Sequence, residues 1–351
     1  MSVEPSESPE PVPGLDFPRL TRWLADTLPD AGALTGATLI AGGRSNLTYR
    51  LDFAGESGGT SVALRRQPLG HVLPTAHDMV REHRVLSALA DSGGVPVPRP
   101  LGLCTDKDVL GADFYVMEWV DGRILRVPED AADVTPGQRA AVSDRLAEAL
   151  AAIHTLDVDK AGLGDFGRPE GYMARQLKRW GQQWERSKTR ELPAYDRLVE
   201  RLAAALPDNP RSGLVHGDFR LDNALVRLEP EPAIAAVVDW EMSTLGDPLA
   251  DLGLTLVYWA EAGEPQLPVG STITAEPGFP TRAQFTERYA ALTGFDVSGL
   301  DYYVAFGCFK LAIILEGIHA RFVKGQTVGE GFDQIGLGVP LLLDRAHEVL
   351  G

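Results

Sequence analysis

The stretch His216-Gly217-Asp218-Phe219-Arg220-Leu221-Asp222-Asn223, which follows the apolar run Gly213–Val215, is the part of the chain from which we infer the fold. Asp218 and Asn223 lie five residues apart in a loop that begins where a predicted strand ends. In phosphoryl transfer an Asp orients and deprotonates the attacking hydroxyl, and an Asn oxygen helps to hold Mg²⁺ beside the nucleotide phosphates. The spacing therefore favours phosphoryl transfer, with Asp218 as the base and Asn223 as a metal ligand.

A second apolar run, Ala233–Val238, predicts another strand and leads directly into Asp239, sixteen residues after Asn223. Any one Asp in such a position is more often a helix cap or a turn former than a ligand. The two motifs in this order and at this spacing favour the functional interpretation. We therefore expect Asp239 to be the second metal ligand.

The chain before residue 120 is dominated by short β-type runs, and we expect strands at residues 37–41, 48–53, 61–65 and 114–119. One helix is predicted among them, over residues 76–90. Glu82 lies on the same apolar face of this helix as Met79 and Leu86, where an unpaired carboxylate would be costly to bury. We therefore expect Glu82 to have a cationic partner.

Helical periodicity dominates from about residue 136, interrupted by a strand-loop-strand region at residues 214–240. A helix over residues 172–187 carries Leu177, Trp180 and Trp184 on one face. Such a stripe is usually core packing, and the functional alternative is an aromatic wall beside an acceptor pocket. Lys310 interrupts an apolar helix over residues 303–323, so its ammonium must either reach solvent or meet an anion.

The catalytic loop, then Val237-Val238-Asp239-Trp240-Glu241, then Gly246-Asp247-Pro248-Leu249-Ala250-Asp251-Leu252, resemble aminoglycoside and choline phosphotransferases. Residues 175–180 and 309–318 more narrowly resemble the kinase-like domain of some acyl-CoA dehydrogenase family proteins and its stand-alone bacterial relatives. The resemblance implies an α+β, protein-kinase-like fold of two lobes. We expect a disordered tail over residues 1–14, an N-lobe over residues 15–120 with a hinge near 117–121, and a mainly helical C-lobe over residues 121–351.

The same resemblance implies a site for ATP or GTP together with Mg²⁺. Ser45 and Asn46 lie in a Gly-rich hairpin that would contact phosphate oxygens, although a lone hairpin of this kind is more often an ordinary turn. Arg65 stands where a Lys is usual and, oriented by Glu82, would hold the α- and β-phosphates. The hinge implies that the carbonyl of Glu118 and the amide of Val120 pair with adenine.

Several other polar residues are expected to be structural. His216 would brace the catalytic loop, Asp247 would cap the helix that follows it, and Asp251 would support the same region. His154 is expected to cap the end of a helix over residues 137–153. The Arg at position 65 leaves open a second reading, in which the chain is a catalytically silent nucleotide-binding or interaction protein of the same fold. A protein kinase is disfavoured because no Ala-Pro-Glu element follows Asp239.

Composition limits the classes of partner. A formal charge of −16 argues against a general nucleic-acid binder, and no uninterrupted apolar run reaches the ~18 residues of a membrane span. The two cysteines, Cys104 and Cys308, are too few for a disulfide framework, so we expect a reducing compartment, the cytoplasm.

Lys178, Arg179, Lys310 and Arg321 fall in the two narrowly similar segments. They favour a hydroxyacyl thioester or another hydroxylated metabolite as the acceptor over a polycationic aminoglycoside, while Trp180 and Lys310 are the candidate substrate contacts. The oligomeric state stays open.

Overall fold

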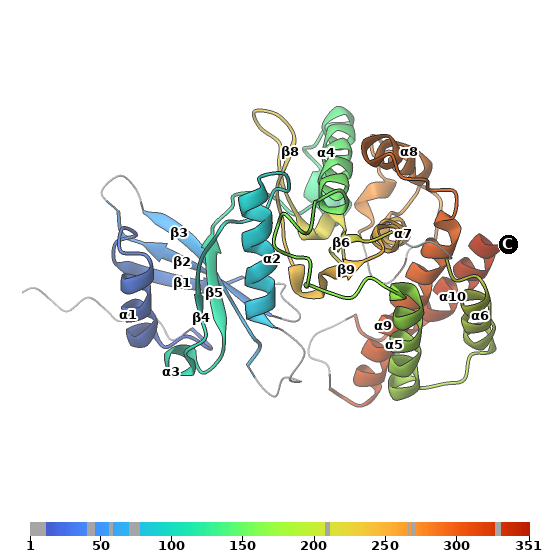
Figure 1. Cartoon of the computed structure of the whole chain (residues 1–351), viewed down its shortest axis with the longest axis horizontal. Coiled ribbons are helices and arrows are strands. Elements are labelled where there is room, and N and C mark those ends of the chain that lie inside the picture. Colours follow the sequence, from blue (N-terminus) through green and yellow to red (C-terminus); the bar gives the residue numbers. More distant parts are fainter. Residues whose placement is uncertain are drawn as a thin grey trace, which may run out of the picture. The chain divides into compact units, whose positions relative to one another are not determined.

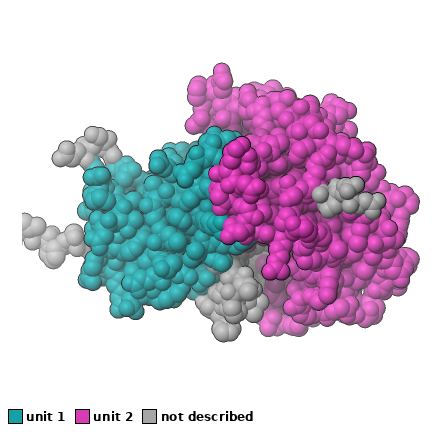
Figure 2. Space-filling model, in the orientation of Figure 1, with its two compact units in different colours: residues 1–121 teal, residues 122–351 magenta. Residues whose placement is uncertain are grey.

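The computed structural model describes residues 12–40, 46–55, 59–69, 78–207, 211–265, 267, 271–326 and 331–351. The chain divides into two compact units, unit 1 with residues 1–121 and unit 2 with residues 122–351 (Figure 2). Unit 1 is built on a β-sheet and unit 2 is mainly helical (Figure 1), so the fold is α+β. The predicted fold class is confirmed.

Unit 1 contains a five-stranded antiparallel sheet with the strand order β1-β2-β3-β5-β4. The strands are β1 Leu34–Leu39, β2 Leu47–Phe53, β3 Thr60–Arg66, β4 Pro100–Cys104 and β5 Phe114–Glu118. Its helices are α1 Phe17–Thr27, α2 Met79–Ser92 and the short α3 Lys107–Leu110. The sequence did not predict α1 or β4.

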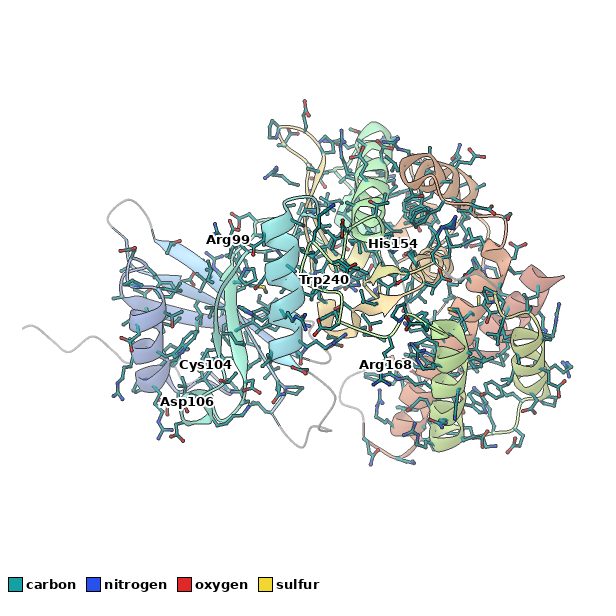
Figure 3. All side chains as sticks on the ribbon, in the orientation of Figure 1. Arg99, Cys104, Asp106, His154, Arg168 and Trp240 are labelled. Carbon is teal, nitrogen blue, oxygen red and sulfur yellow. The ribbon has the colours of Figure 1, made fainter. Side chains whose placement is uncertain are left out.

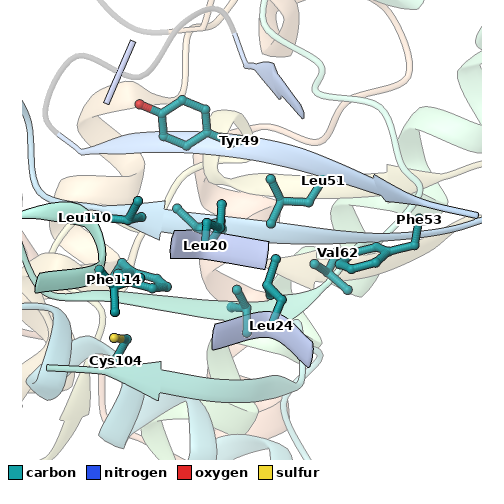
Figure 4. Packing of buried hydrophobic residues seen from close by; sticks show 12 residues of the cluster. Leu20, Leu24, Tyr49, Leu51, Phe53, Val62, Cys104, Leu110 and Phe114 are labelled. Atoms are coloured by element: carbon teal, nitrogen blue, oxygen red, sulfur yellow. The ribbon is translucent and has the colours of Figure 1, made fainter. Parts of the chain in front are cut away.

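The core of unit 1 lies between one face of the sheet and α1 (Figure 4). Side chains alternate between the two faces of a strand, so Tyr49 and Leu51 face this core together with Leu64 of the next strand. They pack against Leu20 and Leu24 of α1. The same alternation directs Arg65, the neighbour of Leu64, to the opposite face of the sheet.

Two expected boundaries in unit 1 change in the structure. The strand predicted at residues 37–41 begins earlier, at Leu34, and residue 41 lies outside the described residues. The helix predicted from residue 76 begins at Met79, because the side chain of Asp78 accepts a hydrogen bond from the Arg81 amide and caps it.

The tail expected over residues 1–14 is shorter than predicted at its C-terminal end. The Tyr49 hydroxyl donates to the carbonyl of Pro13 at 2.6 Å, and the Arg66 guanidinium donates to the carbonyl of Gly14. Residues 13 and 14 are therefore tied to the sheet. Residues 1–11 lie outside the described residues.

In unit 2, the long helix α9 Leu300–Val323 packs against four other helices (Figure 1). These are α5 Tyr172–Ser187, α6 Pro193–Ala204, α7 Pro248–Tyr258 and α10 Gly338–Leu350. The remaining long helices are α4 Pro136–His154 and α8 Arg282–Thr293, which contact each other. Helix α9 is long and apolar enough to cross a membrane, yet 78% of its 18-residue apolar window is buried inside the unit. It is therefore placed as a core helix.

Two small antiparallel sheets carry the loops of interest. β6 Gly213–Val215 pairs with β9 Thr244–Gly246, and β7 Ala224–Arg227 pairs with β8 Ala233–Val237. The chain leaves β6, turns through the stretch that was quoted first, and enters β7. This is the strand-loop-strand region that the sequence predicts.

Candidate active site

The loop between β6 and β7 presents Asp218 with its side chain 26% exposed, so the carboxylate is accessible. The side-chain nitrogen of Asn223 donates to the Asp218 carbonyl at 2.8 Å and to the Asp218 carboxylate at 3.1 Å. This nitrogen fixes the amide, which turns its Oδ1 away from Asp218. A short 3₁₀ turn, Leu221–Asn223, sets this approach. The structure thus brings the predicted base and the first predicted metal ligand together.

Asp239 lies next to Asn223 because β7 and β8 form a hairpin. Ala224 is paired with Val237, and the Val238 amide donates to the Asn223 carbonyl at 2.9 Å. Among the described residues, Asp239 alone has a positive φ, 70°, without being a glycine. Such a conformation costs about 1–3 kcal/mol and is concentrated at functional sites.

The donor set at this hairpin suits a hard cation. Asn223 Oδ1 and the Asp239 carboxylate offer oxygen atoms, the kind of ligand that Mg²⁺ prefers, and Mg²⁺ usually takes one or two carboxylates together with phosphate oxygens and water. The described residues contain no group of three or more His, Cys, Asp or Glu side chains that could hold a metal alone. The two ligands therefore fit a metal that arrives with a nucleotide.

Asp251 of α7 holds the loop between β6 and β7 through two hydrogen bonds to its backbone. Its carboxylate accepts the backbone amides of His216 and Gly217 at 2.5 and 2.8 Å. Burial raises the pKa of this carboxyl group, but hydrogen bonds and charges from His154, His216 and the Gly217 amide outweigh burial, so the pKa lies below its ordinary value. Asp251 therefore acts as a buried anion for the loop.

The role expected for His154 is wrong. Instead of capping α4, its ring lies 2.7 Å from the Tyr289 hydroxyl and 3.4 Å from the Asp251 carboxylate, and the side chain is fully buried. Figure 3 labels His154. The tertiary partners override the helix end because the buried imidazole needs polar partners, and both the Tyr289 hydroxyl and the Asp251 carboxylate lie within its reach.

His216 braces the loop, in the manner expected. Its Nε2 lies 3.0 Å from the Val238 carbonyl, and its Nδ1 accepts from the Asp218 amide at 3.3 Å. Its ring lies 4.6 Å from that of Trp240, which follows β8 (Figure 3). The imidazole thus ties the loop to the end of β8, with both nitrogens occupied by the protein.

Three residues around Asp218 were missed by the sequence reasoning. Arg220 lies 3.8 Å from the Asp218 carboxylate and 3.3 Å from that of Asp222, and its guanidinium stacks 4.8 Å from the ring of Tyr258. Burial, followed by the charge of Asp218, raises the pKa of Tyr258 well above its ordinary value. Burial also raises the pKa of Asp222. The only signal for Arg220 and Asp222 was their charge within the loop, and nothing in the sequence pointed to Tyr258, which lies on α7.

Lys310 and Trp180, the predicted substrate contacts, lie together. The Lys310 ammonium is 5.5 Å from the centre of the Trp180 ring and donates to the Gly217 carbonyl at 2.6 Å. Lys310 is 8% exposed, so it does not reach solvent, and its hydrogen-bond partner is a neutral carbonyl rather than an anion. Trp184 is core, stacked 4.2 Å from Tyr195.

In unit 1, Arg65 and Glu82 form the expected ion pair. Arg65 Nε lies 3.0 Å from the Glu82 carboxylate, and the two side chains are 12% and 1% exposed. The pair follows from the strand alternation that directs Arg65 away from the α1 face and from the position of Glu82 on α2. It places a guanidinium held by a buried carboxylate on this face of the sheet.

The other residues predicted to contact the nucleotide lie in unit 1 near β2 and β5. Ser45 lies outside the described residues, and Asn46 is buried immediately before β2. Glu118 ends β5, where its amide donates to the Arg99 carbonyl at 2.8 Å, and Val120 follows two residues later. These positions leave their predicted nucleotide contacts as predictions.

A β-sheet unit followed by a helical unit that bears an Asp and an Asn five residues apart defines a phosphotransferase of the kinase-like type. The chain belongs to the phosphotransferase enzyme family known as APH, whose family model matches residues 36–285.

The chain is also similar to part of several longer proteins. It is 37% identical over 326 residues to acyl-CoA dehydrogenase family member 11 of Rattus norvegicus, a match that covers 90% of this chain and 41% of that protein. It is 37% identical over 298 residues to family member 10 of Mus musculus, covering 84% of this chain and 27% of that protein. The chain thus spans less than half the length of these curated relatives.

Solved structures show the same fold. A candidate aminoglycoside phosphotransferase of Ralstonia eutropha superimposes with a TM-score of 0.80 at 32% identity, covering 95% of this chain and 98% of that one. A complex of aminoglycoside phosphotransferase APH(4)-Ia with ADP and hygromycin B superimposes with a TM-score of 0.62 at 17% identity, covering 94% and 97%. The predicted family resemblance is confirmed.

Proposed function

We propose that the chain transfers the γ-phosphoryl group of ATP to a hydroxyl group of a small molecule in a reaction that requires Mg²⁺. The observation that carries the proposal is the arrangement of the β6–β7 loop. A partly exposed Asp218 is held by the side chain of Asn223, and Asn223 adjoins Asp239 across the β7–β8 hairpin. A base on this loop and two oxygen donors at the adjoining hairpin are the parts that phosphoryl transfer needs.

In the proposed reaction the acceptor oxygen forms a bond to the γ-phosphorus while the bond to the leaving ADP oxygen breaks. Asp218 orients the acceptor hydroxyl and takes up its proton. Asn223 Oδ1 and Asp239 would hold Mg²⁺, which supplies positive charge to the phosphate oxygens. Arg220, 3.8 Å from the Asp218 carboxylate, adds a fixed cation next to the base.

For the nucleotide, we assign phosphate contacts to Arg65, Asn46 and Ser45 and adenine contacts to the backbone of Glu118 and Val120. The buried Glu82 supports this assignment because it fixes the direction of the Arg65 guanidinium. Neighbouring structures contain ADP with hygromycin B and GDP with kanamycin, so both ATP and GTP are tested as donors.

For the acceptor, we propose a hydroxyacyl thioester or another hydroxylated metabolite. The names of the curated relatives connect this domain with acyl-CoA chemistry. Lys178 and Arg179 are exposed on α5, the helix that carries Trp180, in a chain whose formal charge is −16. Local cations in an acidic protein favour an anionic acceptor over a polycationic one.

The test uses two variants, one in the β6–β7 loop and one at the end of the β7–β8 hairpin. Purified protein is incubated with MgATP or MgGTP and a panel of hydroxyacyl-CoAs, aminoglycosides and choline, and phosphorylated products are sought by mass spectrometry. Asp218→Asn should lower turnover by about 10²–10⁴-fold while MgATP binding survives. Asp239→Asn should instead weaken the Mg²⁺-dependent part of nucleotide binding, measured by calorimetry.

The competing function is a silent nucleotide-binding protein, and the Arg at position 65 is the observation that favours it. If no acceptor gains a phosphate and Asp218→Asn behaves as wild type in every assay, the silent protein is the better description. Nucleotide binding alone does not separate the two functions, because both retain it.

A further inference from the structure

Lys310 is a charged residue in the interior of α9, where burying an ammonium is costly unless something compensates. The other buried charge of this helix, Glu316, accepts the amide and hydroxyl of Thr189 at 2.8 and 2.6 Å and lies 3.2 Å from Arg190. Within the described chain, Lys310 makes one hydrogen bond, to the Gly217 carbonyl. A buried cation with so little compensation suggests a role beyond packing.

The carbonyl that Lys310 holds belongs to the peptide bond between Gly217 and Asp218. The amide of the same peptide group donates to His216 Nδ1 at 3.3 Å, so this peptide is fixed at both of its polar atoms. Gly217 has φ 87°, which a side chain would strain, and an added Cβ would lie 2.7 Å from the Met242 carbonyl. The direction of Asp218 therefore depends on a peptide with little freedom.

Several groups from neighbouring elements act on the ammonium of Lys310. Burial lowers the pKa of Lys310, the carboxylates of Asp218 and Asp251 act to raise it, and Arg179 of α5 acts to lower it. The Trp180 ring, 5.5 Å away, closes the α5 side with the face of an aromatic ring, which attracts a cation. The catalytic loop, α5 and α7 thus each contribute a group that faces the ammonium.

We propose that Lys310 is a positioning residue of the phosphotransfer site, whose ammonium donates to the Gly217 carbonyl and so holds the Gly217–Asp218 peptide that directs the Asp218 carboxylate. The proposal rests on the proposed function for its kinetic meaning. Its structural part, the fixing of the catalytic peptide by a side chain from α9, stands without that function.

The kinetic expectation follows from what the ammonium does. Lys310→Met keeps the length and apolar body of the side chain but removes the donor and the charge. We expect kcat to fall about 10- to 100-fold, since small displacements of a catalytic group have effects of this size, while KM for MgATP stays within about twofold.

The rescue variant is Lys310→Arg, which restores a donor and a charge and should recover part of kcat while KM for MgATP stays near its wild-type value. The matched control is Lys324→Met, at the end of the same helix, where the side chain is exposed. It should change neither measurement. Where no acceptor has been found, the probe reaction is the release of inorganic phosphate from MgATP, with water as the acceptor.

A measurement that needs no activity completes the test. Hydrogen exchange of the peptide covering residues 213–223, followed by mass spectrometry, should accelerate in Lys310→Met and not in Lys324→Met, while α4 and α8 exchange at the wild-type rate. Unchanged exchange in this peptide would overturn the proposal. So would exchange that rises equally throughout unit 2, because that result describes packing alone. If Asp218→Asn leaves turnover intact, the proposed function fails, and the exchange result still decides whether Lys310 fixes the peptide.

Discussion

Asp247 and Asp251 are two buried carboxylates at the start of α7, and the structure predicts that the same substitution destabilises the fold much more at Asp251 than at Asp247. Asp251 accepts the amides of His216 and Gly217 and has a lowered pKa. Asp247 accepts the Leu249 amide at 3.1 Å and the Tyr303 hydroxyl at 2.5 Å, and burial raises its pKa. The perturbation is Asp→Asn at each position in turn.

The expected magnitudes follow from the donors. In Asp251→Asn one oxygen becomes an NH₂ group that faces a backbone N–H, and a backbone amide cannot reverse its direction. A hydrogen bond to a charged group contributes about 1.5–3 kcal/mol, and a buried donor left without a partner costs about 1–3 kcal/mol. We expect the free energy of unfolding of unit 2 to fall by about 2–4 kcal/mol.

At Asp247 the same change should cost less than about 1 kcal/mol. Asn caps a helix about as well as Asp, so the Leu249 amide keeps its acceptor. The Tyr303 hydroxyl can rotate and accept from the new NH₂ group, because a hydroxyl both donates and accepts. The raised pKa also means that folding already disfavours the charged form of Asp247.

The assay is urea unfolding at pH 7, followed by circular dichroism and tryptophan fluorescence, and repeated toward acid. A carboxyl group with a lowered pKa stabilises the fold above its ordinary pKa of about 3.9, and that contribution disappears as the pH falls through this range. The difference between wild type and Asp251→Asn should therefore shrink below about pH 4. A loss at Asp247 equal to that at Asp251, or a change of less than about 1 kcal/mol at Asp251, would show that the loop does not depend on this anion.

Three further outcomes are expected. Glu82→Gln should lower the free energy of unfolding of unit 1 by about 3 kcal/mol, because it leaves a largely buried guanidinium without its carboxylate. In a double-mutant cycle measured by unfolding, the variant that also carries Arg65→Met should recover most of this loss, and additive losses would contradict the pairing. Gly217→Ala should destabilise the fold more than Gly263→Ala, although both glycines have φ 87°, because of these two positions only Gly217 has other atoms close to the new Cβ. The backbone strain that both variants share is about 1–2 kcal/mol, and equal shifts of the thermal midpoint would contradict the close approach to Met242. Burial raises the pKa of Cys308 to about 11 and also raises that of Cys104, so a thiol reagent at pH 8 should label the folded protein far more slowly than the urea-unfolded protein; rapid labelling of the native chain would show that the core opens.

The parts of the site that the sequence predicts are those whose partners are close in sequence or whose geometry is periodic. Asp218, Asn223 and Asp239 lie within one loop and one hairpin, so their spacing already limits where they can be. The pairing of Arg65 with Glu82 was predictable because the strand period sets the face of the sheet on which Arg65 lies, and the helix period places Glu82 on an otherwise apolar face of α2. In both cases local geometry was enough.

The contacts that support the loop were not predictable in the same way. Asp251, Lys310 and Tyr289 meet Gly217 or His154 across 34, 93 and 135 residues of chain, respectively. A polar residue on an apolar helix face indicates that a partner exists, but periodicity carries no information on which distant residue it is. For Lys310 the sequence offered solvent or an anion, and the structure supplied a backbone carbonyl instead.

The two segments with the narrower resemblance now have a physical connection. Arg175, at the start of α5, donates to the carbonyls of Arg168 and Glu170, and so fixes the turn from which this helix begins. One turn further on, Trp180 lies beneath the ammonium of Lys310 on α9. Helices α5 and α9 pack side by side (Figure 1), so a shift of α5 would move the ring away from the cation that holds the Gly217 carbonyl. Trp180 contacts Lys310, and Lys310 holds the peptide that precedes Asp218, so both segments connect to this one peptide. A substitution in either segment should therefore change first the direction of the Asp218 carboxylate.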